Sequence, residues 1–77
     1  MRKRFHPGLF LQELLEWRRI GPGELSRVTG IEESVIIGIT EQRYPIDEPV
    51  SEALAEYFGN SARFWITVQR SFDRKGP

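Results

Sequence analysis

Residues 21–43, GPGELSRVTGIEESVIIGITEQR, contain two short helical patterns separated by a turn at residues 29–31. Leu25 and Val28 give the first pattern an apolar side. In the second pattern, apolar residues recur at the spacing of one helix face, at Ile31, Val35, Ile36 and Ile39. Gly30, within the turn, can adopt a positive φ angle at little cost. This arrangement predicts a helix-turn-helix over residues 22–41.

Length and composition favour one small domain spanning residues 1–77. A domain of this size without cysteine often gains stability by forming a dimer. With no cysteine and only one histidine, His6, the sequence predicts no metal site and no cofactor. We expect His6 to bond the backbone at a helix start. The absence of cysteine suits a cytoplasmic protein. No apolar run approaches the roughly 20 residues that a membrane span needs, so we expect no membrane contacts.

Charge is unevenly distributed along a chain whose net charge is zero. Residues 1–19 carry a net charge of +3, residues 20–56 carry −6, and residues 57–77 carry +3. The helix-turn-helix is therefore acidic, which is unfavourable for a protein that neutralises DNA phosphates. Residues 1–6 are expected to form a flexible basic N-terminus, in which Arg2, Lys3 and Arg4 either contact phosphate or lie in solvent.

Helical periodicity and capping residues predict five helices and no sheet, an all-α domain of the lambda-repressor-like helix-turn-helix type. The first runs from Leu9 to about Arg18, the second from residue 22 or 23 to 28 or 29, and the third over 32–41. Asp47 is the expected N-cap of the fourth, and Asn60 or Ser61 that of the fifth. We expect four aromatic or apolar side chains to lie in the core or a dimer interface: Trp17, Phe64, Trp65 and Val68.

Three motifs resemble those of the HigA-type antitoxins, which belong to the XRE (lambda-repressor-like) superfamily. They are His6-Pro7-Gly8, the hairpin residues Glu24-Leu25 with Gly30-Ile31, and residues 55–65, AEYFGNSARFW. The last string is similar to the family pattern YFG-x-S-A-x-FW, and the likeness extends over residues 6–73. The resemblance implies a small DNA-binding regulator that dimerises, represses its own promoter and neutralises a toxin encoded beside it, commonly an mRNA-cleaving ribonuclease.

The sequence departs from the family pattern where DNA is contacted. The second helix usually starts with Ser-Gln, which touches phosphate, whereas residues 21–22 are Gly-Pro. The third usually starts with a sequence such as Ser-Arg-Ser-Arg and is followed by Asn-Gly-Lys-Arg. Here residues 32–35 are EESV and residues 41–44 are EQRY. These replacements predict weaker binding to operator DNA.

The side of the third helix opposite its apolar stripe supplies the candidate base contacts, Glu33, Ser34, Ile37 and Gly38. A carboxylate can accept from cytosine N4, a serine can bond either kind of base edge, and an isoleucine can touch a thymine methyl group. Gly38 would permit close approach to the duplex. Alternatively, the glutamates are solvated and Ile37 lies in a protein interface. Phosphate contacts are assigned to Arg27, Thr40, Gln42 and Arg43.

Two functions remain open from the sequence. The first is a homodimeric repressor of the antitoxin type, which binds palindromic operator DNA with weakened affinity and neutralises a small ribonuclease toxin. The alternative is a protein-interaction module that binds a toxin or dimerises and has weakened or lost DNA binding. An enzyme is not expected, because the sequence offers no constellation of nucleophile and base.

Overall fold

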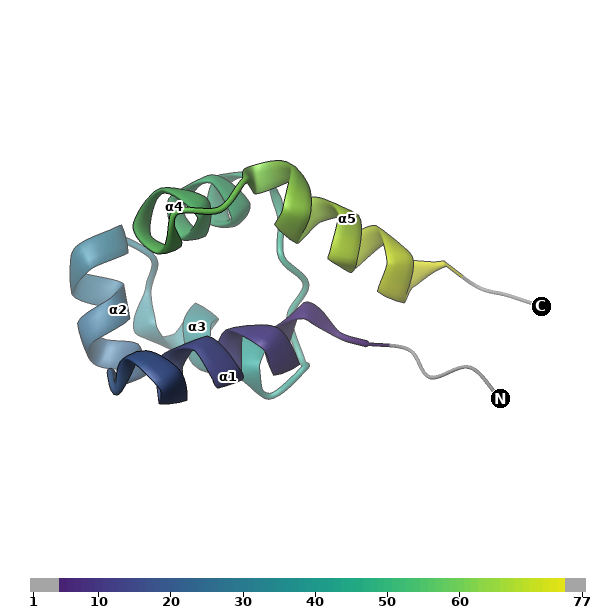
Figure 1. The fold of residues 1–77 in the computed structure, drawn as a ribbon. Coiled ribbons are helices and arrows are strands. Elements are labelled where there is room, and N and C mark those ends of the chain that lie inside the picture. Colours follow the sequence, from purple (N-terminus) through teal and green to yellow (C-terminus); the bar gives the residue numbers. More distant parts are fainter. Residues whose placement is uncertain (1–4, 75–77) are drawn as a thin grey trace.

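The computed structural model describes residues 5–74, which form five α-helices and no strand (Figure 1). The helices are α1 (Pro7–Arg18), α2 (Pro22–Thr29), α3 (Glu33–Thr40), α4 (Glu48–Phe58) and α5 (Ala62–Asp73). The all-α, five-helix prediction is therefore confirmed. Arg2, Lys3 and Arg4 lie outside the described residues. Within residues 5–74, no helix has the length and apolar character that crossing a bilayer requires.

Most helix ends follow from local capping chemistry. The Asp47 carboxylate accepts a hydrogen bond from the Val50 N–H at 3.1 Å, and the Ser61 hydroxyl accepts one from Phe64 N–H at 3.0 Å. The start of α1 is less ordinary, because the cap is a histidine. His6 Nδ1 accepts a hydrogen bond from the Gly8 N–H at 2.8 Å, and α1 therefore begins two residues before the predicted Leu9.

His6 is buried, so the predicted flexible N-terminus does not extend to residue 6. Its ring meets the edge of the Phe72 ring at the end of α5, with centroids 4.8 Å apart. Burial lowers the pKa of His6, whereas Asp73 and a hydrogen bond to the backbone of Tyr44 act in the opposite direction. The neutral imidazole thus connects α1 to α5 and to the segment after α3.

The core lies where all five helices meet. The helices α1, α2 and α3 occupy one side of the domain and α4 and α5 the other, with the described chain ends near each other (Figure 1). Trp65 of α5 is fully buried, and its ring contacts those of Phe10, Phe58 and Phe64. Its indole N–H donates to Asn60 Oδ1 at 2.9 Å, which satisfies the polar edge of the buried ring.

A buried amide fixes the segment that joins α3 to α4. Gln69 of α5 accepts a hydrogen bond from the Ile46 N–H through Oε1 at 2.8 Å and donates to Asp73 Oδ1 at 3.0 Å. Ile46 is itself buried in the core. The C-terminal helix therefore anchors the chain shortly after the end of α3, and this link positions the surface described next.

Candidate nucleic-acid interface

The turn between α2 and α3 is held by its own side chains and backbone. The Thr29 hydroxyl donates to the Leu25 carbonyl at 2.6 Å and accepts from the Ile31 N–H at 3.2 Å. Gly30 has a φ of 80°, the left-handed conformation predicted for it, and its N–H donates to the Ser26 carbonyl. These contacts fix the direction in which α3 leaves the turn.

The helix α3 is divided between a core side and an outer side. Ile36 and Ile39 are fully buried. Glu33 and Ser34 are exposed, and Ile37 is half-buried on the outer side. Three of the four candidate base contacts therefore belong to one accessible surface, which a ligand could reach without unfolding the domain.

Gly38, the fourth candidate, is covered by the loop that follows α3. It is buried, and the Tyr44 ring lies directly against it. A Cβ atom placed on Gly38 would lie 2.7 Å from Tyr44 Cε2 and 2.9 Å from Tyr44 Cγ. The expectation that Gly38 permits close approach of DNA is therefore wrong. The glycine permits close approach of a tyrosine from the following loop instead.

The loop after α3 folds back over the last turn of the helix. The Glu41 N–H donates to the Ile37 carbonyl at 2.9 Å. The Gly38 carbonyl accepts from both the Arg43 and the Tyr44 N–H groups, at 2.8 and 3.2 Å. These bonds satisfy carbonyl groups that a helix end leaves free, and they hold the loop in one position.

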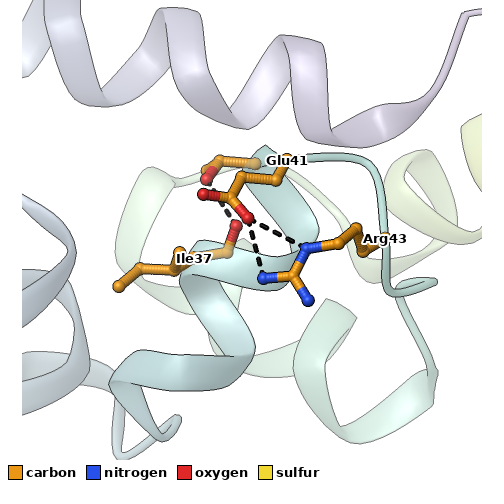
Figure 2. A network of polar contacts seen from close by, with 4 residues as sticks. Ile37, Glu41 and Arg43 are labelled. Carbon is orange, nitrogen blue, oxygen red and sulfur yellow. Dashed lines mark hydrogen bonds and ion pairs between the residues drawn. The ribbon is translucent and has the colours of Figure 1, made fainter.

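Arg43 is the candidate phosphate contact with the most defined environment. Its Nη2 lies 2.7 Å from Glu41 Oε1, and its Nε donates to the same oxygen at 2.9 Å (Figure 2). The guanidinium also lies over the Tyr44 ring, 5.6 Å from the centroid. The hydrogen bond and charge of Glu41 raise the pKa of Arg43. This cation therefore already has a carboxylate partner in the free protein.

The other candidate phosphate contacts differ in how free their donors are. Arg27, in the last turn of α2, and Gln42 are exposed. Gln42 has a φ of 64°, the left-handed conformation, which turns the chain back over α3. The Thr40 hydroxyl donates to the Ile37 carbonyl at 2.8 Å, so its only proton is used within the helix.

Glu33 is turned towards the beginning of α2. A Cβ atom placed on Gly23 would lie 3.5 Å from Glu33 Oε2. The partial positive charge of a helix N-terminus favours a carboxylate at this position. The same end of α2 is where the resemblance leads one to expect a phosphate contact, so Glu33 places negative charge beside it.

A second surface, the Trp17 groove, lies on the outer side of α1. It is lined by Phe10, Glu13, Leu14, Glu16 and Trp17. Trp17 is 80% exposed, so it does not belong to the core of the protomer, and its place in a dimer interface stays a prediction. Phe64 and Val68 are half-buried, and Phe64 meets the Phe10 ring at 5.1 Å between centroids.

Sequence reasoning missed two residues that organise the interface, Tyr44 and Gln69. Tyr44 entered the prediction only as part of residues 41–44, EQRY, although a glycine inside an isoleucine-rich helix, as at Gly38, is a signal of close packing. Its partner could not be identified from the sequence. Among residues 5–74, no three histidine, cysteine, aspartate or glutamate side chains are grouped so that they could hold a metal ion.

Comparison with known proteins gives structural neighbours only. No protein-family model and no curated protein matches the chain. The Pseudomonas aeruginosa antitoxin HigA, solved with the higBA promoter, is 28% identical with a TM-score of 0.89; the match covers 92% of this chain and 78% of that one. PA4674 from the same organism, solved with 28-bp operator DNA, is 26% identical with a TM-score of 0.89, over 92% and 79% of the two chains.

A third similar structure is an addiction module antidote protein of the HigA family from Coxiella burnetii. It is 25% identical with a TM-score of 0.86, and the match covers 94% of this chain and 79% of that one. The shared helix order extends over nearly the whole chain, in agreement with the motifs at residues 6–8, 24–31 and 55–65. The chain therefore shares the five-helix fold of these HigA-family antitoxins and is similar to them over nearly its whole length.

Proposed function

We propose that the protein is a DNA-binding repressor of the antitoxin type, which acts on its own operon and neutralises a partner toxin. The observation that carries the proposal is the α2–turn–α3 unit with its accessible outer side, in a fold shared with a HigA antitoxin solved on promoter DNA and with PA4674 solved on operator DNA. These neighbours favour a DNA-binding regulator over an enzyme and over an interaction module that has lost DNA binding.

In the proposed complex, α3 enters the major groove. Glu33, Ser34 and Ile37 contact base edges, with Glu33 accepting from cytosine N4 and Ile37 touching a thymine methyl group. Before it can reach a base, the Glu33 carboxylate has to leave its position beside Gly23. Arg27 and Arg43 contact phosphates at the two edges of the unit, together with Gln42. Thr40 joins them only when its hydroxyl leaves the Ile37 carbonyl.

We propose that the repressor binds as a homodimer, because two half-sites one helical turn apart multiply a weak contact made by each protomer. The apolar surfaces available for such a seam are the Trp17 groove and the half-buried Phe64 and Val68. An exposed tryptophan beside other apolar side chains is typical of a protein interface. The same surfaces are available to a small ribonuclease toxin, and we place both interactions in the cytoplasm, where the operon lies.

The test is fluorescence anisotropy with a duplex taken from upstream of the protein's own gene and a scrambled duplex of equal length, over a series of KCl concentrations. We expect preference for the upstream duplex. We also expect weak binding to the scrambled one with a shallow salt dependence, because each neutralised phosphate contributes only about 0.9 to the log–log slope. A slope near that of strongly basic repressors would mean that the DNA surface has been misplaced.

Glu33→Gln tests the assignment of a base contact. It should lower the preference for the upstream duplex while affinity for both duplexes rises, because one negative charge leaves the interface. Glu52→Gln makes the same change of charge on α4, outside the helix-turn-helix, and should leave the preference intact. If the natural chain and both variants preferred the upstream duplex equally, Glu33 would not contact a base. Absence of binding to either duplex at low salt would refute the proposal that the protein is a repressor. Purification of the protein in its native complex tests the proposed toxin interaction, and we expect a small partner protein to co-purify with it.

A further inference from the structure

The exposed pair of Arg43 and Glu41 lies at the end of α3, on the proposed DNA surface. Both contacts of the guanidinium, from Nη2 at 2.7 Å and from Nε at 2.9 Å, go to the same carboxylate oxygen. Both side chains are more than half exposed, so the pair is in contact with solvent and a phosphate could reach it.

The pair is held in place by the fold of the loop. Glu41 follows α3 directly, and its N–H donates to the Ile37 carbonyl. On the other side, the Tyr44 ring packs on Gly38 and lies under the Arg43 guanidinium. Because Glu41 and Arg43 are thus anchored at both sides, the carboxylate stays near the guanidinium even when the pair opens.

We propose that Glu41 competes with DNA phosphate for Arg43, so that the loop after α3 contributes a full positive charge to bound DNA only when the pair is broken. A phosphate binds Arg43 through the same N–H groups that Glu41 occupies. In the free protein Arg43 is already neutralised, so its transfer to phosphate releases fewer counterions than transfer of a free arginine.

Glu41 therefore lowers the overall affinity of this surface for DNA and leaves its preference among sequences unchanged. The competition weakens binding to every duplex, whatever its sequence, because phosphates are present everywhere along DNA. Only a site that adds favourable base contacts along α3 offsets this loss. The inference rests on the proposed function, since it requires that this surface meets DNA.

Four proteins test the proposal: the natural chain, Glu41→Gln, Arg43→Gln and the double variant. Affinity for a labelled duplex of random sequence is measured at several KCl concentrations. Glu41→Gln should tighten binding by up to about fivefold, the range that exposed ion pairs reach, and steepen the log–log salt slope by up to about 0.9. Arg43→Gln should weaken binding by about fivefold in the Glu41→Gln background and by less than about twofold in the natural background.

Glu32→Gln is the matched control. It removes the same charge at the other end of α3, where no arginine partner of Glu32 is found within residues 5–74. Its effect should therefore be the same with and without Arg43. The NMR signal of the Arg43 Nε–H reports the pair directly, and it should move in Glu41→Gln without any DNA.

Additive effects of Glu41→Gln and Arg43→Gln would overturn the competition while leaving the repressor intact. The competition would also be overturned if Glu41→Gln increased the affinity for the random duplex no more than Glu32→Gln does. Failure of the proposed function looks different, because neither the natural chain nor Glu41→Gln would then bind duplex at low salt. That outcome would refute both the proposed function and the competition.

Discussion

Replacing Gly38 by alanine tests the contact that shapes the loop after α3. The new Cβ would lie 2.7 Å from Tyr44 Cε2 and 2.9 Å from Tyr44 Cγ, closer than real Cβ atoms come to other heavy atoms. Because Cγ is the ring atom nearest the tyrosine backbone, a small rotation of the ring does not relieve the clash. The ring has to leave the helix, or the loop has to move.

Two opposite effects decide the magnitude. Alanine in a helix interior is more favourable than glycine by about 0.5–1 kcal/mol. Forcing an extra carbon into a packed site costs about 1–3 kcal/mol. We therefore expect Gly38→Ala to lower the free energy of unfolding by about 0.5–2 kcal/mol. When Tyr44→Ala has first removed the ring, the same substitution should raise it by about 0.5–1 kcal/mol, so the sign reverses.

Urea denaturation followed by circular dichroism measures both values. With a slope near 1 kcal/mol per M for a small domain, the expected shifts of the midpoint are about 0.5–2 M. Gly23→Ala in α2 is the matched control, because its Cβ would meet Glu33 Oε2 at an ordinary 3.5 Å. Stabilisation by Gly38→Ala in the natural background would refute the reasoning, since the Tyr44 ring would then not occupy the site.

Trp65→Ala should lower the free energy of unfolding by about 3–5 kcal/mol, a large part of the about 4–12 kcal/mol expected for a domain of 77 residues. A cooperative thermal melt close to that of the natural chain would contradict this expectation. The stability of the domain should also fall as the pH drops below about 6.5, because burial lowers the pKa of His6 and the folded state then binds fewer protons than the unfolded state. His6→Asn, which keeps a capping acceptor, should flatten this dependence in urea titrations at pH 5 to 8. If the free energy of unfolding of His6→Asn depended on pH as steeply as that of the natural chain, the pH dependence would come from groups other than His6.

The local features of this chain could be predicted from its sequence. Helix existence depends on apolar periodicity, and helix ends depend on residues within one turn. The five helices were therefore predicted together with the cap Asp47, and the cap of α5 was predicted as Asn60 or Ser61, of which the structure has Ser61. The positive φ of Gly30 belongs to the same class, because it is set by the turn itself. The family resemblance rested on such local motifs as well.

The tertiary structure decided which faces are covered and which charges meet. Gly38 lies on the outer side of α3 by periodicity alone, but the loop that returns from Tyr44 covers it. Trp17 follows the apolar stripe of α1 in sequence, yet no other element of the described chain covers it. The buried link from Gln69 to Ile46 joins residues 23 positions apart, a pairing that no local pattern specifies. A helix fixes the direction of its own side chains, whereas burial and pairing depend on segments brought together only by folding, and for that reason the loop after α3 could be described only from the structure.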